Sequence, residues 1–262
     1  GQYFIPKNLS ISQIIDIFKL GKVVQHKITI PEGLTTLETI SRIRENKFLM
    51  GKINKEFYEL EGLFLPETYY FNKGYTRDDL LNRMRNDMQK ILDNDWNNRL
   101  ASLPYKTKYD VLKMASIIES ETGAEPEKKL IASVFINRLN RNMKLQSDPT
   151  VSYGLEKINK KKIKKIKKSH LRIDHVWKTY TRYGLPQSPI SNPGRSSIYA
   201  ALNPFQTNYY YFVADNKFFL TFKMKVVTPD GGETELLVAD YIVMEDGKIA
   251  QIRPYFFANP FA

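Results

Sequence analysis

One stretch decides the fold of this chain: Ala115-Ser116-Ile117-Ile118-Glu119-Ser120-Glu121-Thr122. It sets two carboxylates two positions apart on a run, residues 111–121, whose apolar side chains recur with the period of a helix. A carboxyl group flanked by apolar side chains is desolvated, and desolvation raises its pKa toward the range where it donates a proton near neutral pH. The stretch therefore indicates a carboxylate enzyme. The alternative is that both glutamates only solvate one edge of a surface helix.

A helical wheel leaves open which glutamate matters. At about 100° per residue, the apolar positions of this run form one broad arc. Glu119 lies at one edge of the arc, beside Ala115, and Glu121 lies toward the other side, near Met114 and Ile117. Either carboxylate can be partly buried in this arrangement.

The rest of the central region also has helical periodicity. We expect the glutamate-bearing helix to run from near Lys108 to near Gly123, a residue that suits a helix C-cap. We expect further helices over residues 77–100, 127–140 and 196–202.

A second polar segment follows about 25 residues after the glutamates. Residues 146–150 (Gln-Ser-Asp-Pro-Thr) are expected to form a loop, in which Pro149 biases Asp148 toward an extended conformation. Residues 184–194, with three prolines, are expected to form a rigid extended loop, and residues 209–213 a buried strand.

The first part of the chain repeats itself. Residues 5–15 (Ile-Pro-Lys-Asn-Leu-Ser-Ile-Ser-Gln-Ile-Ile) match residues 30–40 (Ile-Pro-Glu-Gly-Leu-Thr-Thr-Leu-Glu-Thr-Ile). Each copy has Ser or Thr followed three residues later by Gln or Glu, a capping box that opens a helix. Each helix follows a short strand-like segment, residues 3–5 and 27–30. This strand–turn–helix pattern resembles a LysM-like subdomain, a glycan-binding module. The alternative is a small α+β scaffold that only packs on the rest of the chain.

Composition is that of a globular protein. The chain has 262 residues, 42% of them hydrophobic and 13% aromatic, which is enough to bury a core and form two or three subdomains. No run of about 18 apolar residues predicts a transmembrane helix, and no signal-peptide pattern is seen. With no cysteine, the sequence excludes disulfides and thiolate sites. His26, His170 and His175 show no metal-ligand spacing, so we expect no metal and no cofactor.

The net charge of +12 suits an anionic partner: nucleic acid, anionic lipid or an anionic polymer. Much of this charge lies in a lysine-rich run, residues 157–168. The run is either a solvated insert or basic helix end, or a contact surface for lipid head groups or cell-wall polymer. Because no aromatic residue interleaves with these lysines, we do not expect nucleic acid as a partner.

The end of the chain has a different pattern. Residues 222–227, 235–244 and 248–255 alternate as strands, and turn residues fall between them at 229–232 and 246–247. They predict three strands joined by hairpins. The pattern of residues 219–262 resembles the final strands of the fold shared by nuclear transport factor 2 and ketosteroid isomerase, but we assign it no isomerase chemistry.

Several blocks of this chain, taken together, resemble the endolytic murein transglycosylases, the YceG-like family. They are residues 61–69 (Glu-Gly-Leu-Phe-Leu-Pro-Glu-Thr-Tyr), 114–122, 134–139 (Val-Phe-Ile-Asn-Arg-Leu), 143–151 (Met-Lys-Leu-Gln-Ser-Asp-Pro-Thr-Val), 184–194 (Gly-Leu-Pro-Gln-Ser-Pro-Ile-Ser-Asn-Pro-Gly) and 211–215 (Tyr-Phe-Val-Ala-Asp). The blocks occur in the order found in the family, and the resemblance extends from residue 1 to about residue 217.

The resemblance implies a mechanism with one carboxylate, unlike that of ordinary glycosidases, which use two. It implies that Glu119 is the acid and base and that Glu121 supports it. The glutamic acid protonates the glycosidic oxygen and then accepts the proton of the muramyl C6 hydroxyl, which closes a 1,6-anhydro ring. The resemblance also implies a set of substrate-binding residues: Glu121, Asn137, Gln146, Ser147, Asp148, Thr150, Tyr153 and Tyr180. The alternative for the two tyrosines is a place in the core.

Two features depart from the family pattern. Residues 177–180 read Trp-Lys-Thr-Tyr where the family has Tyr-Asn-Thr-Tyr, so an amide contact at Lys178 is lost or changed. The strand-rich tail replaces the family's terminal helix. The family also carries an N-terminal membrane anchor, which is not seen ahead of Tyr3, so we expect a truncated chain.

We therefore expect an α+β fold with three parts. A LysM-like region covers residues 1–75, a mixed α+β catalytic domain covers 76–218, and a three-stranded β tail covers 219–262. The expected partners are peptidoglycan glycan strands, cell-wall synthases and the membrane through the missing anchor. The expected location is the bacterial inner membrane, with the catalytic part facing the periplasm or the exterior. The alternative function is a non-catalytic wall protein that binds peptidoglycan or an anionic membrane.

Overall fold

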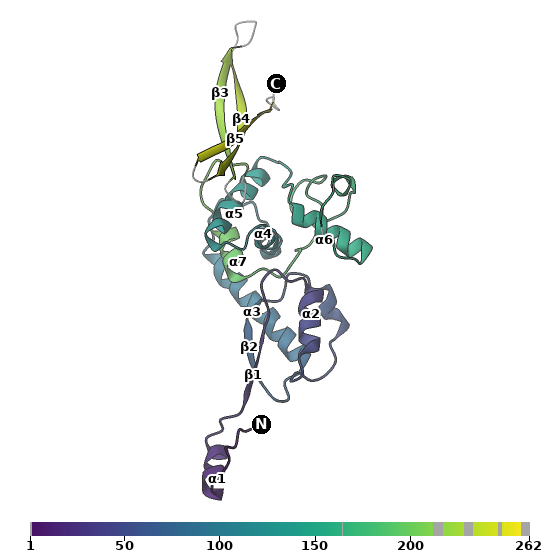
Figure 1. Cartoon of the computed structure of the whole chain (residues 1–262), viewed down its shortest axis with the longest axis vertical. Helices are drawn as coiled ribbons and strands as arrows, with labels where there is room; N and C mark the ends of the chain where they lie inside the picture. Colours follow the sequence, from purple (N-terminus) through teal and green to yellow (C-terminus); the bar gives the residue numbers. More distant parts are fainter. Residues whose placement is uncertain (1, 164, 212–216, 228–232, 246–247, 258–262) are drawn as a thin grey trace.

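The structure is a computed structural model that describes residues 2–163, 165–211, 217–227, 233–245 and 248–257, the last three ranges as backbone only. Figure 1 shows an elongated molecule with a helix at its N-terminal end, a helical middle and a three-stranded sheet at its other end. The helices of the described residues are α1 (Ile11–Lys19), α2 (Thr36–Glu45), α3 (Arg77–Asn97), α4 (Lys108–Glu121), α5 (Glu125–Asn140), α6 (Asp148–Asn159) and α7 (Arg195–Leu202), with short 3₁₀ turns at Lys55–Glu59 and His170–Arg172. The strands are β1 (Gln25–Thr29), β2 (Thr68–Asn72), β3 (Lys217–Val227), β4 (Glu233–Glu245) and β5 (Lys248–Phe257). The expected α+β class is confirmed.

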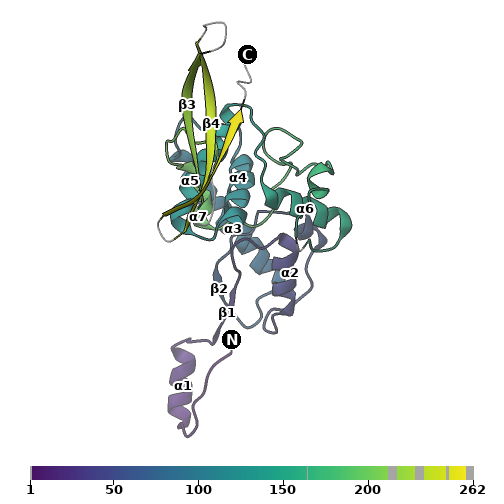
Figure 2. The ribbon, with the colours of Figure 1, turned by 45° about the horizontal axis from the view of Figure 1, so that its top comes forward.

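The first core lies between a small sheet and two helices. β1 and β2 pair antiparallel, with Ile28 opposite Tyr69, and α2 packs beside them (Figure 2). Ile40 and Ile43 of α2 are fully buried in this core. The same cluster includes Met84 of α3, so it extends beyond residue 75, where we placed the edge of the N-terminal region. That domain boundary stays a prediction.

The second core surrounds α4. Every residue of this helix from Val111 to Ile118 except Lys113 is buried, so neighbouring elements cover it on nearly all sides. α5, α7 and the second half of α3 provide this cover. Ala115 and Ile118 are completely buried. The predicted helix is confirmed and is buried, and Glu119 in its last turn contacts α5 and α7.

Local capping signals start the helices as predicted. Capping boxes are present at Ser10 and Thr35, and Thr76 and Thr107 cap α3 and α4 in the same way. Helix ends are less accurate. α4 ends at Glu121 with Thr122 as an extended C-cap, so the prediction of a C-cap at Gly123 is wrong. α3 ends at Asn97 rather than at residue 100, and α5 begins at Glu125 rather than at residue 127.

The predicted loop at residues 146–150 is largely wrong. Ser147 is the N-cap of α6, and the helix begins at Asp148. Pro149 lies in the first turn, where a helical N–H has no partner to lose, so proline starts this helix instead of keeping the segment extended. α6 then runs into the lysine-rich run and ends at Asn159, followed by Lys160 as a C-cap with a left-handed conformation.

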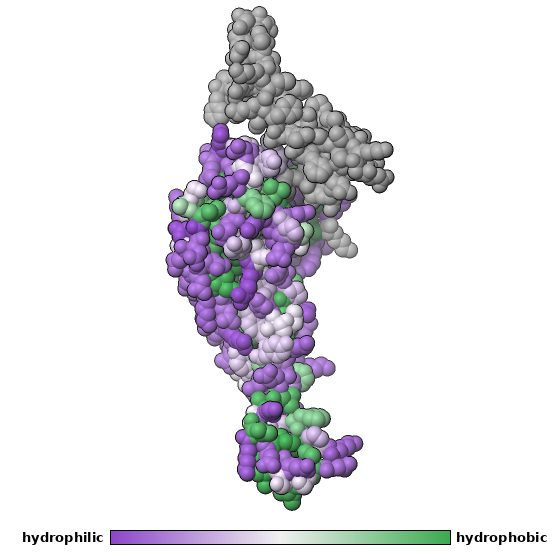
Figure 3. All heavy atoms as spheres, turned by 90° about the vertical axis from the view of Figure 1, so that its left-hand side faces the viewer, coloured by the Kyte–Doolittle hydropathy of each residue, from purple (hydrophilic) through white to green (hydrophobic). Residues whose placement is uncertain are grey.

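The two N-terminal repeats adopt the same helix in different surroundings. α2 is packed into the first core, whereas α1 has no buried residue, and Ile11 and Leu20 are 79% and 67% exposed. Figure 3 shows apolar residues gathered on the surface at this end of the molecule. The predicted strand at residues 3–5 is absent. The expected LysM-like layout therefore has a strand-and-helix counterpart only in the second copy and stays a prediction.

The three predicted tail strands are confirmed. β3, β4 and β5 form an antiparallel sheet in that order. The turns expected at residues 229–232 and 246–247 lie outside the described residues. The strand expected at 209–213 is not formed over residues 209–211, where Tyr209 is exposed, and residues 212 and 213 lie outside the described part.

Candidate active site

Glu119 is held by donors from two neighbouring helices. Lys128 of α5 donates from Nζ to Oε1 at 3.1 Å. The backbone N–H of Gly194 and the hydroxyl of Ser197 donate to Oε2 at 2.9 and 2.7 Å. Gly194 is the N-cap residue of α7 and has no side chain to cap the helix, so the Glu119 carboxylate takes that role. The Glu119 side chain is only 6% exposed.

Glu32 is a third charged group beside the ion pair of Glu119 and Lys128. Lys128 is 4% exposed, and its Nζ also lies 3.7 Å from Glu32 Oε2 and donates to Ser196 Oγ at 2.8 Å. Glu32 comes from the turn that precedes α2, so the N-terminal region contributes a carboxylate to the site. Burial raises the pKa of Glu32, and the Glu119 carboxylate raises it further, whereas Lys128 lowers it.

Asn192 fixes this turn against the rest of the protein. It is completely buried, and its backbone exchanges hydrogen bonds with Gly33 and Leu34 at 3.0 and 2.8 Å. Its side-chain oxygen accepts from the N–H of Phe64 at 3.0 Å. Gly33 has a φ of +77°, which favours glycine, and a Cβ there would lie 3.7 Å from Glu119 Cγ. The N-terminal region therefore lies directly on the Glu119 side chain.

Glu121 has a different environment. Its Oε1 accepts one short hydrogen bond, 2.5 Å, from the hydroxyl of Ser147. Burial raises the pKa of Glu121, Asp148 adds to this effect, and the Ser147 hydrogen bond and the charge of Arg138 oppose it. The Arg138 guanidinium donates to the carbonyls of Leu145 and Tyr210, both at 2.6 Å.

The predicted polar segment gathers around Glu121, not Glu119. Ser147 and Thr150 are buried, and both bond to Thr179. Asp148 is exposed and accepts from the Tyr180 hydroxyl at 2.6 Å. Burial raises the pKa of Tyr180, and this hydrogen bond raises it further. Gln146 is exposed and has a φ of +51°. The side chains of this group that reach the surface are those of Gln146, Asp148 and Tyr180.

Tyr153 is placed in the core. It is 7% exposed, and its hydroxyl donates to Oε2 of buried Glu61 at 2.9 Å. Oε1 of Glu61 accepts from the N–H of Thr36, the first residue of α2. The Tyr153 ring meets Trp177 edge-on, with 5.5 Å between centroids. The structure thus uses Tyr153 to join α6 to α2, and its ring is not available to stack on a sugar.

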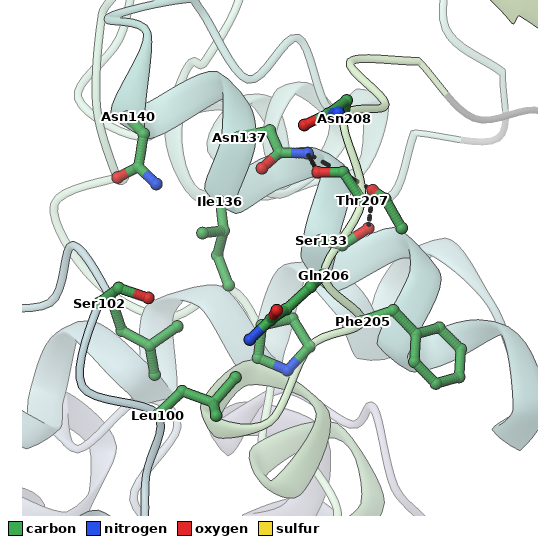
Figure 4. A pocket seen from close by; sticks show the side chains of 12 residues that line it. Leu100, Ser102, Ser133, Ile136, Asn137, Asn140, Phe205, Gln206, Thr207 and Asn208 are labelled. Carbon is green, nitrogen blue, oxygen red and sulfur yellow. Dashed lines mark hydrogen bonds between the residues drawn. The ribbon is translucent and has the colours of Figure 1, made fainter.

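Asn137 lies apart from both glutamates. Its amide donates to the carbonyls of Thr207 and Tyr209 at 2.8 and 2.9 Å. Figure 4 shows it on the wall of a pocket of about 260 Å³ between α5 and residues 204–208. Neither Glu119 nor Glu121 lines this pocket. The structure brings together Glu121 and the 146–150 segment but places Asn137 elsewhere.

Sequence reasoning missed most of the residues around Glu119. They are Glu32, Lys128, Gly194, Ser196 and Ser197. One signal was available: Lys128 occupies the same face of its helix as Ile131, Ala132 and Phe135, and a lysine in an apolar stripe needs a buried partner.

Lys178 replaces the amide expected at this position and has a structural role. It is 1% exposed, and its ammonium donates to the carbonyls of His170 and Ile173 at 3.0 and 2.6 Å. Lys178, which departs from the family pattern, therefore holds the backbone of the loop before it and does not contact the glutamates.

The lysine-rich run is mostly exposed, but two of its members contact the N-terminal region. Lys162 pairs with Glu38 at 2.5 Å, and Lys157 lies 3.5 Å from Glu61. Across the part of the chain that the structure describes, no three His, Asp or Glu side chains gather in a way that could hold a metal ion. None of the helices described is both long and apolar enough to cross a bilayer.

Two curated proteins are similar to this chain in sequence. An endolytic murein transglycosylase of Bacillus subtilis (strain 168) is 32% identical over 248 residues, covering 82% of this chain and 66% of the relative. A Streptococcus pneumoniae protein of the same name is 27% identical over 80% of this chain and 40% of its own length. This chain therefore spans less than two thirds of either relative.

A crystal structure of a YceG-like protein from Listeria monocytogenes superimposes with a TM-score of 0.60 at 27% identity, covering 81% of this chain and 78% of that one. The model of the YceG-like family matches residues 1–225, which include every residue of the site described above. The chain belongs to the YceG-like family.

Proposed function

We propose that this protein is a lytic transglycosylase that cleaves the β-1,4 bond between N-acetylmuramic acid and N-acetylglucosamine within peptidoglycan strands. The observation that carries the proposal is the place of Glu119: a carboxylate in the last turn of a buried helix, held by an ammonium, a backbone N–H and a hydroxyl. The naming of its relatives as endolytic murein transglycosylases supports the substrate class.

Glu119 acts twice in the proposed reaction. The Glu119 carboxyl group first gives its proton to the glycosidic oxygen, and the bond to the muramyl C1 breaks. The carboxylate then accepts the proton of the C6 hydroxyl of the same sugar, whose oxygen bonds to C1. The product ends in a 1,6-anhydro ring, no water is consumed, and Glu119 regains its proton. Because the nucleophile belongs to the substrate, it reacts at a high effective concentration and no second carboxylate is needed.

The hydrogen-bond donors around Glu119 suit the step of the reaction in which Glu119 is ionised. Between the two proton transfers Glu119 is a carboxylate, and Lys128, Ser197 and the Gly194 N–H already point at it. Fixed donors of this kind need no reorganisation when the charge forms. Gln146, Asp148 and Tyr180, which reach the surface beside Glu121, are the proposed contacts to sugar hydroxyl and acetamido groups.

A second candidate is a wall protein that binds without cleaving. The low exposure of Glu119 and the basic run favour it, because a covered acid cannot reach a glycosidic bond while exposed lysines can adsorb to anionic polymers. In either case we propose the bacterial inner membrane as the location, with the part described facing the periplasm or the exterior, and cell-wall synthases as partners.

The deciding experiment is a digest of purified peptidoglycan with the intact chain and with Glu119→Gln. The amide keeps the size of the side chain but has no proton to transfer, so release of anhydro-ended fragments should fall by roughly 10²–10⁴-fold. Products with ordinary reducing ends would indicate hydrolysis. A variant with unchanged activity would show that the acid lies elsewhere, with Glu121 as the next candidate. Binding of both proteins without any product would favour the second candidate.

A further inference from the structure

Two carboxylates share one buried ammonium at the site. Lys128 Nζ lies 3.1 Å from Glu119 Oε1 and 3.7 Å from Glu32 Oε2. Since the Lys128 side chain is 4% exposed, protein groups and not bulk water must balance its charge. When all three groups are ionised, the cluster carries a net negative charge. One proton on either carboxylate makes it neutral.

The turn that carries Glu32 is seated directly against the Glu119 contacts. A Cβ at Gly194 would lie 1.8 Å from Glu32 Oε1, so the Glu32 carboxylate occupies the space next to the residue whose N–H binds Glu119. The other charged groups that face this cluster are Glu67 and Arg195, which pair at 2.9 Å. Glu67 also raises the pKa of Glu32, but less than Glu119 does.

Building on the proposed function, we propose that Lys128 and Glu32 are positioning residues for Glu119: Lys128 holds the carboxylate in place, and Glu32 offsets the charge of Lys128. Glu32 thereby limits the net positive charge that the Glu119 carboxyl group meets. Because Glu32 belongs to the N-terminal region, the catalytic group is complete only when that region is seated on α4.

The two residues have opposite effects on the same proton. On the alkaline side of the pH–rate profile, activity is lost when the acid gives up its proton. Without the negative charge of Glu32, Glu119 loses its proton more readily and the alkaline limb moves to lower pH. Without the positive charge of Lys128, Glu119 keeps its proton longer and the limb moves to higher pH.

The test measures release of anhydro ends from soluble glycan strands between about pH 4 and pH 9. We expect Glu32→Gln to move the alkaline limb down by roughly one pH unit, and Lys128→Met to move it up by a similar amount. Lys128→Met should also lower the maximal rate by about tenfold or more, because the carboxylate loses a fixed donor. Lys128→Arg should restore the position of the limb.

Matched controls separate this effect from a change in net charge. Glu45→Gln removes an exposed carboxylate of α2 that accepts a hydrogen bond from Ser41. Lys129→Met removes the next cation on α5, which lies over the rings of Tyr199 and Phe205. Neither should move the limb. Thermal unfolding checks that each variant folds. Glu32 is half exposed, so Glu32→Gln carries the test if Lys128→Met does not fold.

A titration without substrate gives an independent readout. In protein labelled with ¹³C at glutamate carboxyl carbons, the Glu119 resonance is assigned by its absence in Glu119→Gln. Its midpoint should move in opposite directions in Glu32→Gln and Lys128→Met. If both variants titrate and react like the wild type while Glu119→Gln is inactive, the inference is wrong and the proposed function stands. An active Glu119→Gln overturns the proposed function instead.

Discussion

Glu119 and Glu121 are separated by one residue on α4, yet they lie in contrasting environments. Glu119 accepts hydrogen bonds from an ammonium, a backbone N–H and a hydroxyl, and a second carboxylate lies across the ammonium. Glu121 accepts one hydroxyl hydrogen bond, and burial raises its pKa. Residues two apart on a helix point to different sides, so one helical turn presents two carboxylates to two separate sets of neighbours. Adjacent acids in a sequence motif are therefore separate chemical sites.

The largest effect that would sharpen this comparison concerns Arg138, whose positive charge lowers the pKa of Glu121. Arg138→Met leaves the carbonyls of Leu145 and Tyr210 without their donors, and we expect the free energy of unfolding to fall by about 3 kcal/mol. Urea denaturation measures this change. Arg141→Met, an exposed arginine on the same helix end, should stay within about 0.5 kcal/mol of the wild type. If the free energy of unfolding fell equally in the two variants, the hydrogen bonds of Arg138 would not be what stabilises the fold.

An intermediate effect tests the donors of Glu119. Ser197→Ala removes the 2.7 Å hydroxyl donor and keeps Lys128 and the Gly194 N–H. We expect the rate of anhydro-end release to fall by roughly tenfold, the equivalent of about 1.4 kcal/mol, with little change in stability. The control is Ser120→Ala, an exposed serine between the two glutamates that bonds only to its own helix. If Ser120→Ala loses as much activity, the Ser197 contact has no special role.

The smallest effect concerns the raised pKa of Glu121. A carboxyl group whose pKa is higher in the folded state destabilises the protein as pH rises through its unfolded value and up to its folded one. Glu121→Gln should therefore unfold at a slightly higher temperature than the wild type at pH 7, and the gap should close below about pH 4. Calorimetry at several pH values checks this. Glu59→Gln, at an exposed position, should show no such dependence. A gap that widens toward acid pH would contradict the burial of Glu121.

The sequence predicted those features that depend on neighbours along the chain. The helix of Glu119 and Glu121, its start near Thr107 and the capping boxes at Ser10 and Thr35 are all local patterns, and the structure contains them. The strands of the tail are of the same kind, because alternation over ten residues needs no distant partner.

The features that the sequence did not predict depend on contacts between distant segments. Glu32 is far from Glu119 along the chain, and no periodicity predicts that the buried Asn192 binds the turn that carries Glu32. The start of α6 was misjudged because a proline biases its predecessor away from a helix but also fits the first turn. Helix α1 shows that a correct local prediction does not give burial. Its capping box is present as predicted, but the box does not indicate whether other parts of the protein pack on the apolar face of the helix.

Helix α3 passes through both cores of the molecule. Its first half buries Leu80, Leu81 and Met84 in the core of the N-terminal sheet, and its second half buries Met88 and Leu92 against α4. A continuous helix cannot lose its packing at one end without loosening the other, so the two halves are expected to unfold in a single cooperative transition. Amide hydrogens in the middle of α3 should then exchange with solvent only through global unfolding. The core that contains α2 would then not unfold separately from the core around α4.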